Sequence, residues 1–175
     1  MKLRSATPAD DVALRAFAAA LDARDRTFLG DDPSVCAAPE SPGVRDHPLR
    51  WIATADDRII GYASLRRLPA HSRHVGILRL AVASGHRRSG TGTDLARHAL
   101  VESLHEGVLK VVVEIAAEQE PVIRMFRNLG FSAEALLRDQ LRDENGSFHD
   151  LLMLAHHARA DWSAMDTVGL TGELD

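Results

Sequence analysis

The sequence has a single cysteine, Cys36, among its 175 residues, so no disulfide can form within the chain. Such scarcity of cysteine is typical of proteins in a reducing compartment. The first residues lack the apolar core of a signal peptide. No apolar run approaches the roughly 20 residues that a membrane-spanning helix requires. These absences predict a cytoplasmic protein with no membrane partner.

Positive charge is not in excess either, because 21 Lys and Arg residues stand against 25 Asp and Glu residues. The net charge of −4 gives no general electrostatic case for nucleic acid, which proteins bind through cationic contacts to phosphates. We therefore predict no nucleic-acid partner. The histidines show no zinc-like spacing with cysteine, so no metal is predicted. The adjacent His156 and His157 are interpreted as a surface pair.

The composition that is present, 45% apolar and 26% charged, is that of a globular protein with one core. No internal repeat or linker divides the chain. We predict one domain over residues 1–157, followed by a polar, acidic tail over residues 158–175. The protein is expected to be a monomer or a homodimer.

Local patterns predict an alternation of helices and strands around the middle of the chain. Thr7 can cap a helix, Pro8 suits the first helical position, and Asp10 suits the positive end of the helix dipole. Residues 30–48 are rich in Pro, Gly, Ser and Asp and predict a long, functional loop. The predicted elements are a helix to about residue 22, two strands around the turn 55–58, a strand at 74–83, a helix at 92–107, a strand at 108–117, a helix at 121–130, and strands at 131–138 and 148–156.

The stretch "RRSGTG", residues 87–92, lies between a predicted strand and a predicted helix. A helix N-terminus presents unpaired N–H groups and a partial positive charge, and glycines let the backbone approach an anion closely. Arg87 and Arg88 add positive charge. The stretch is either a phosphate or pyrophosphate cradle or an ordinary glycine-rich turn. It lacks the lysine of a P-loop and the three spaced glycines of a dinucleotide fingerprint.

Three segments together resemble the GNAT superfamily of acetyltransferases. Residues 87–92 match the family pattern Gln/Arg-x-x-Gly-x-Gly/Ala, and "MFRNLGF", residues 125–131, is similar to the family's "lYeklGF". The segment "LLRDQLRDENGSFHDLLMLA" is similar to the family's closing hairpin. The resemblance covers about residues 3–156. It implies an α/β fold with a mixed, mostly antiparallel sheet of six to seven strands, helices on both faces and a central V-shaped splay.

The resemblance also implies acetyl-CoA as cosubstrate. Its pyrophosphate would be held by the backbone N–H groups of the motif, and its pantetheine arm would pair with the strand before it. Core packing of the strand's side chains is compatible with this role, because main-chain atoms make the cofactor contacts. Gln119 stands where the family often has an Asn that contacts pantetheine, and Phe126 stands at the family's Tyr position. The cofactor-binding residues implied are Leu80, Ala81, Val82, Arg87, Arg88, Ser89, Gly90, Thr91, Gly92, Gln119 and Phe126.

Acetyl transfer to an amine requires a base, because a free amine is mostly protonated at neutral pH. Glu114 is a lone carboxylate in the apolar run "KVVVEIAA", where a charge is costly unless it reaches water or a partner. In the ribosomal-protein alanine acetyltransferases of this superfamily, a glutamate on this strand, five residues before the Asn position, is the base. Glu114 lies five residues before Gln119 and is predicted to be catalytic. The alternative is a glutamate that only faces solvent or pairs with an arginine.

The general acid is not evident, since Phe126 cannot donate a proton. Tyr62 is the only tyrosine and is interpreted as a half-buried strand residue, so the thiolate would leave unassisted or take a proton from water. His149 and Asp150 could form a catalytic pair, but Asp150 is interpreted as a structural hydrogen-bond acceptor in the closing hairpin.

Acidic residues outnumber arginines between positions 10 and 46, and an acidic rim suits a cationic acceptor. We therefore predict an N-acetyltransferase that acts, by direct attack in a ternary complex, on a protein lysine, a protein N-terminus or a small cationic amine. Two alternatives remain open: the acidic residues serve only solubility, or the protein is a non-catalytic acetyl-CoA-binding sensor, which the missing tyrosine would suit. The acidic residues are Asp10, Asp11, Asp22, Asp25, Asp31, Asp32, Glu40 and Asp46.

Overall fold

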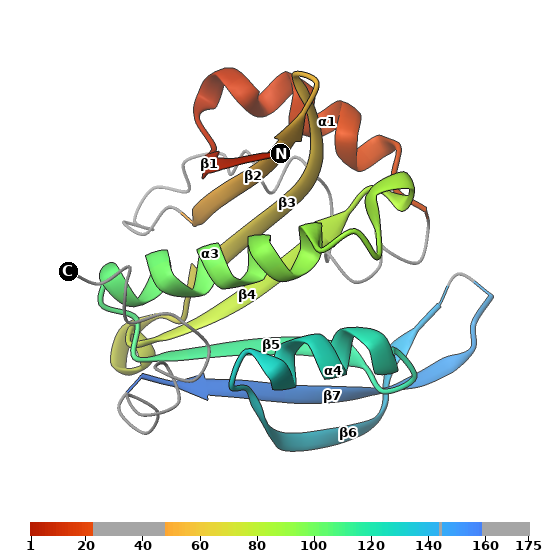
Figure 1. The fold of residues 1–175 in the computed structure, drawn as a ribbon. Helices are drawn as coiled ribbons and strands as arrows, with labels where there is room; N and C mark the ends of the chain where they lie inside the picture. The colour runs from red at the N-terminus through yellow and green to blue at the C-terminus, as the bar shows by residue number, and fades with distance from the viewer. Residues whose placement is uncertain (23–47, 144, 159–175) are drawn as a thin grey trace. The chain divides into compact units, whose positions relative to one another are not determined.

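A computed structural model describes residues 1–22, 48–143 and 145–158 of the chain. The long loop predicted at 30–48 and the predicted tail fall almost entirely outside these ranges, so the domain boundary after residue 157 stays a prediction. The helices and strands, in chain order (Figure 1), are β1 (Lys2–Ser5), α1 (Asp11–Ala19), β2 (Leu49–Ala55), β3 (Arg58–Arg67), β4 (Val75–Val82), α3 (Thr91–His105), β5 (Lys110–Ala116), α4 (Glu120–Asn128), β6 (Ser132–Arg142) and β7 (Phe148–His157).

Within the described ranges, the seven strands pair in the order β1-β2-β3-β4-β5-β7-β6. β4 and β5 are parallel, whereas β1 with β2, β2 with β3, β5 with β7 and β7 with β6 are antiparallel. This arrangement confirms the predicted mixed, mostly antiparallel sheet. The ladder between β4 and β5 is short and runs from Val75 opposite Lys110 to Ile77 opposite Val112.

β1 is a strand that the sequence pattern does not predict. Its residues are mostly exposed and show no apolar alternation. They are ordered by pairing with β2, from Lys2 opposite Thr54 to Ser5 opposite Trp51. Tertiary pairing therefore overrides a weak local preference, as is common for edge strands.

The described chain divides into two compact units, and β4 and α3 each contribute to both. The first unit comprises Met1–Arg66 with Arg79–Ala99. The second comprises Arg67–Leu78 with the chain from Leu100 onward. Among the described residues, no helix is long and apolar enough to cross a membrane.

In the first unit, β2 and β3 form the predicted hairpin, with Asp56 and Asp57 as the two turn residues. Both have positive φ angles, 47° and 57°. A two-residue turn of this hand matches the twist of the strands that it joins, and Asp tolerates positive φ better than most residues. The predicted turn at 55–58 is therefore confirmed.

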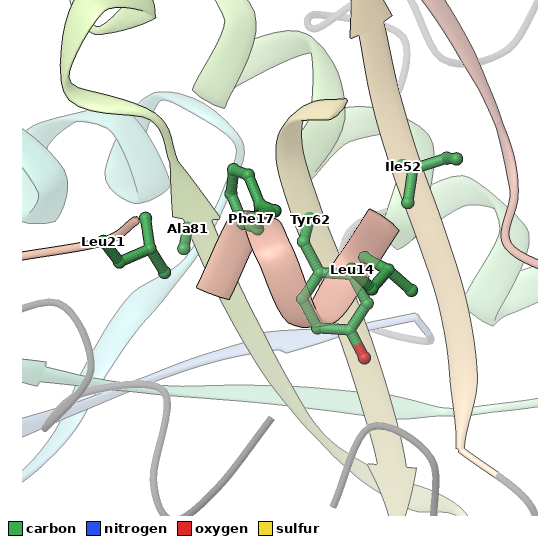
Figure 2. Close-up of a cluster of buried hydrophobic side chains, with 6 residues drawn as sticks. All are labelled: Leu14, Phe17, Leu21, Ile52, Tyr62 and Ala81. Atoms are coloured by element: carbon green, nitrogen blue, oxygen red, sulfur yellow. The ribbon is translucent and has the colours of Figure 1, made fainter. Parts of the chain in front are cut away.

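A cluster of buried side chains forms a hydrophobic core in the first unit, and Figure 2 shows its six side chains. Tyr62 is only 2% exposed within it, so the prediction of a half-buried tyrosine is wrong. The residue packs with apolar side chains of α1 and β4, which the local strand pattern does not reveal. The cluster consists of Leu14, Phe17, Leu21, Ile52, Tyr62 and Ala81.

In the second unit, β7 carries His156, whose side chain is 1% exposed. The prediction of a surface pair is therefore wrong for this residue. The His156 ring lies 5.5 Å from the ring of Phe131, centroid to centroid. A side chain at Gly130 would approach the imidazole to 3.3 Å, and Gly130 also has a φ of 84°. The glycine after α4 thus provides both the turn and the room for a buried histidine.

His157, the other half of the pair, belongs to an ionic network that ties three strands together. Its Nε2 lies 2.8 Å from Glu134 Oε1 on β6, and Lys110 Nζ on β5 lies 2.6 Å from Glu134 Oε2. Hydrogen bonds from Lys110, and then from His157, lower the pKa of Glu134. The network therefore contributes to stability only while this carboxylate is ionised.

We expect Glu134→Gln to lower the free energy of unfolding at pH 7, and the difference from the parent protein to shrink in acid. A carboxyl with a lowered folded-state pKa stabilises the fold above its unfolded pKa of about 4.3 and loses that contribution as the pH falls further. Denaturant titrations from pH 7 down to about pH 3 measure the difference. Glu106→Gln, outside this network, is the control. A difference that stays constant across this range would contradict the prediction.

Candidate functional site

The glycine loop, residues 83–92, follows the end of β4, and a backbone hydrogen bond fixes its first residue. Ala83 N–H donates to the Ile60 carbonyl at 2.9 Å, which ties the loop to β3. A short 3-10 turn, Ser84–His86, follows, and His86 N–H donates back to the Ala83 carbonyl at 2.8 Å. All these contacts lie within the first unit.

The backbone of the glycine loop turns left-handed twice. Arg88 has a φ of 59° and Gly90 a φ of 90°. A side chain at Gly90 would meet nothing closer than Asp94 Oδ2 at 3.9 Å, so glycine is favoured here by backbone conformation and not by lack of space. Successive backbone N–H groups in a turn of this kind can form a concavity that binds an anion.

Side chains hold the loop in this shape. Ser89 Oγ donates to the His86 carbonyl at 2.7 Å and lies 2.9 Å from Thr91 Oγ1. Thr91 is only 3% exposed. Arg87 Nε donates to the Val82 carbonyl at 3.2 Å. The predicted motif therefore contains bracing hydroxyl and guanidinium groups in addition to the glycines.

Helix α3 begins at Thr91, so the last two residues of the loop form the start of the helix. The Asp94 N–H donates to the Gly90 carbonyl at 3.0 Å, which is the first bond of the helical ladder. The N–H groups of Thr91, Gly92 and Thr93 precede this bond and have no partner within the helix. Together with the positive end of the helix dipole, they offer the chemistry of an anion site.

Burial along β4 changes phase before the loop, because the buried residues are Gly76 and Leu78 and then, three residues on, Ala81. Ala81 is 5% exposed and belongs to the buried cluster, whereas Leu80 and Val82 are half-buried. In the described part of the chain, the ladder of β4 with β5 ends at Ile77 and does not include these three residues. Core packing at Ala81 is compatible with a main-chain contact to the pantetheine arm, and that contact stays a prediction.

In the second unit, Glu114 is an exposed residue of β5 between the buried Val113 and Ile115. It pairs in register with Met153 of β7. Its carboxylate is accessible to water and does not bear the cost of burial that its apolar surroundings in the sequence suggest. This position suits both a base and a merely solvated residue, so the catalytic role stays a prediction.

Gln119 and Phe126 lie at the start and on the inner face of α4. The Gln119 carbonyl accepts the N–H groups of Val122 and Ile123, at 3.0 and 3.1 Å. Phe126 is 3% exposed, and its ring stands edge-on to that of Phe131 at 5.1 Å. Phe126 is thus a core residue of the second unit, and its implied role in cofactor binding stays a prediction.

Asp150 has the structural role that the sequence analysis favours over catalysis. Its Oδ1 accepts the Asp139 N–H at 2.9 Å, where β6 bulges and Asp139 has a φ of 51°. His149 turns elsewhere, with Nδ1 2.7 Å from Glu118 Oε1 and Nε2 3.3 Å from Asp143 Oδ2. His149 and Asp150 therefore do not form the pair considered from the sequence.

The sequence predicts a turn at residues 144–147, between the last two strands, but gives Asp143 no role in it. Asp143 organises this turn between β6 and β7. Its Oδ1 accepts the N–H groups of Asn145 at 2.9 Å and Ser147 at 2.8 Å. Hydrogen bonding from the Ser147 N–H, and next from His149, lowers the pKa of Asp143. An Asp two residues before Asn in a predicted turn is the signal that could have indicated it.

Comparison with known proteins connects this geometry to a family. Residues 17–131 match the acetyltransferase (GNAT) family. The chain belongs to this family. The matched span includes the glycine loop, β5 and α4, and it confirms the family that the three motifs indicate.

An N-alpha-acetyltransferase from Sulfurisphaera tokodaii is 25% identical over 109 residues, which are 56% of this chain and 65% of that protein. The chain thus spans less than two thirds of this relative. The ribosomal-protein-alanine N-acetyltransferase from Brucella melitensis has a similar structure, with a TM-score of 0.74, 24% identity, and coverage of 90% of this chain and 99% of that chain. The Salmonella typhimurium protein yncA, solved with its cofactor acetyl-CoA, has a TM-score of 0.69, 17% identity, and coverage of 90% and 93%. These two similarities show that the GNAT fold is shared.

The acidic residues that suggest a cationic acceptor are paired wherever the structure describes them. Arg4 binds Asp10 through both carboxylate oxygens, at 2.7 and 2.8 Å, and lowers the pKa of Asp10 far below its usual range. Asp11 pairs with Arg50 at 2.9 Å, and Asp22 pairs with Arg87 at 3.2 Å. The described aspartates thus give little support to a negative rim, and the other acidic residues of this stretch lie outside the described ranges.

We expect Gly92→Val to weaken acetyl-CoA binding more than it weakens folding. A branched side chain in the first turn of α3 would obstruct an anion at the free N–H groups. Its effect on the helix is small, because Val and Gly differ by only about 0.4 kcal/mol in helix propensity. Calorimetric titration with acetyl-CoA and thermal melting measure the two effects. Thr93→Val, which adds no bulk in the same turn, is the control, and unchanged affinity in a folded Gly92→Val protein would contradict the expectation.

Proposed function

We propose that this protein is an N-acetyltransferase that transfers the acetyl group of acetyl-CoA to a primary amine in a ternary complex. The observation that carries this proposal is the braced glycine loop at the start of α3. Its left-handed residues, Arg88 and Gly90, occur at the family's pyrophosphate motif in a chain that belongs to the GNAT family. The N–H groups of residues 87–92 would hold the pyrophosphate, and the main chain of residues 80–82 would pair with the pantetheine arm.

The chemistry requires that a proton leave the amine before or during attack. We assign this step to Glu114, which accepts the proton directly or through a water molecule, since its side chain is exposed. The amine nitrogen then forms a bond to the thioester carbonyl carbon. The tetrahedral intermediate would collapse by breaking the carbon–sulfur bond, and the CoA thiolate would take a proton from water. Glu114 would then return its proton to the hydroxide that is left. Gln119 would contact the pantetheine arm.

Among amine acceptors, we favour a protein N-terminus. The Sulfurisphaera tokodaii relative is named an N-alpha-acetyltransferase, and an α-amino group is an easier substrate at neutral pH than a lysine. The reason is its pKa of about 8, against about 10.4 for the lysine side chain, so a larger fraction is neutral. The arginine pairs of Asp10, Asp11 and Asp22 give no electrostatic preference for a polycationic small molecule. A panel of peptides with free N-termini, lysine peptides and polyamines tests this choice.

We expect Glu114→Gln to preserve acetyl-CoA affinity and to lower turnover, most strongly near neutral pH. Glutamine keeps the shape of the side chain but cannot accept a proton, and a general base commonly contributes about 10²–10⁴-fold. Thiol release from acetyl-CoA with a responsive peptide, followed from pH 6 to 9, measures the loss. Glu102→Gln removes a partly exposed carboxylate from α3, 3.9 Å from His105 Nδ1, and is the control. Equal rates for the parent and Glu114→Gln proteins across this range would remove Glu114 from the mechanism.

The second candidate function is an acetyl-CoA-binding sensor without turnover. Phe126 is the specific observation that favours it, because phenylalanine stands at the family's tyrosine position and cannot donate a proton. Binding of acetyl-CoA without thiol release, across a broad amine panel, would support the sensor over the enzyme.

We expect Phe126→Tyr to change turnover by no more than about tenfold, a barrier difference of about 1.4 kcal/mol. An active enzyme whose thiolate leaves without this acid gains little from the hydroxyl. A decayed catalyst would instead rise measurably from a near-zero rate. Thiol release and thermal melting are measured together, because a hydroxyl left in the core beside Phe131 would cost stability, by about 1–3 kcal/mol. A rate increase of far more than tenfold would contradict our choice of the enzyme with unassisted departure.

A further inference from the structure

The side chain of Arg87 runs back along the start of the glycine loop and bridges two elements of the first unit. Its Nε lies 3.2 Å from the carbonyl oxygen of Val82, which is the last residue of β4, and its Nη2 lies 3.2 Å from Asp22 Oδ2. Its own N–H reaches the Ser84 carbonyl at 3.4 Å. The backbone N–H and the guanidinium of Arg87 therefore both fix the short turn of residues 84–86.

Asp22 is placed for this contact by the buried cluster. The preceding residue, Leu21, is 5% exposed and packs in the same cluster as Ala81 of β4, as Figure 2 shows. The partly buried Ala83 packs against that cluster as well. Apolar packing therefore brings the chain after α1 to the end of β4, and the ion pair fastens the same two segments at the surface.

Whether removal of Asp22 tightens or weakens pyrophosphate binding depends on what the Arg87 side chain does. A carboxylate close to an anion-binding loop would repel a pyrophosphate unless a cation neutralises it. If Arg87 binds the pyrophosphate directly, Asp22 competes for the guanidinium, and removing Asp22 tightens binding. If Arg87 instead shapes the loop, Asp22 is its anchor, and removing Asp22 loosens the loop and weakens binding. The two roles therefore predict opposite effects of one substitution.

We propose that Arg87 is a positioning residue of the glycine loop and that its pair with Asp22 holds the loop in the shape that binds the pyrophosphate of acetyl-CoA. The inference rests on the proposed function, because it takes acetyl-CoA as the ligand of the loop. It is supported by the direction of the guanidinium, which is bound to the Val82 carbonyl and to Asp22. Such preorganisation raises affinity by lowering the cost of ordering the backbone on binding.

The test is a set of calorimetric titrations with acetyl-CoA on the full-length protein and its variants. We expect Asp22→Ala to weaken binding about three- to fivefold, the range that an exposed ion pair can contribute. Arg87→Gln should weaken it at least as much, and the double variant should be no weaker than Arg87→Gln alone, because both changes break the same ion pair. Asp22→Glu keeps the carboxylate and should restore affinity to within about twofold.

Asp11→Ala is the matched control, since it removes an arginine-paired carboxylate from α1 without contacting the loop. In steady-state assays, a positioning role should raise the KM for acetyl-CoA in Asp22→Ala and leave kcat unchanged. Tighter or unaltered acetyl-CoA binding in Asp22→Ala would overturn the inference. This variant alone shows whether affinity rises or falls, so the test holds even if Arg87→Gln fails to fold. Absence of acetyl-CoA binding by the parent protein would instead overturn the proposed function itself.

Discussion

The left-handed backbone at Arg88 and Gly90 is the constraint on which the glycine loop depends. An L-residue in this conformation costs about 1–2 kcal/mol, so the loop keeps its shape only where other contacts hold it. Ser89 supplies such contacts inside the loop, and Arg87 supplies them at its base. The loop leads into the start of α3, where the first N–H groups have no partner within the helix. Binding there would require little reorganisation of the backbone.

In the second unit, strand pairing and helix packing determine the positions of Glu114 and Phe126. Strand pairing sets the direction of each side chain on β5, and it leaves Glu114 exposed between two buried neighbours. Helix α4 turns Phe126 inward onto Phe131, and His156 packs beyond it. This arrangement leaves the Glu114 carboxylate exposed to water and places the apolar ring of Phe126 in the core. The first suits a proton acceptor, and the second offers no acid, which is why the proposed departure of the thiolate uses water.

Local chemistry explains what could be predicted. The turn at Asp56 and Asp57, the glycine loop and the strand of β5 each have a pattern that is complete within a few residues. β1, the burial of Tyr62 and the burial of His156 were missed or wrong because each depends on a partner that is distant in the sequence. The pairing of Asp10, Asp11 and Asp22 with arginines has the same cause, and it changes the interpretation of a stretch that looks acidic in the sequence alone.

The sequence by itself determined the family, most of the elements and the loop that would hold the cofactor, because periodicity, turn residues and a short motif are local properties of the chain. Only the tertiary structure decided which charges are paired and which side chains are buried. Those outcomes depend on the packing of segments such as the end of α1 against the end of β4, where Asp22 meets Arg87 across 65 residues of sequence. Coulomb attraction and desolvation act over a few ångströms of space, whatever the separation along the chain.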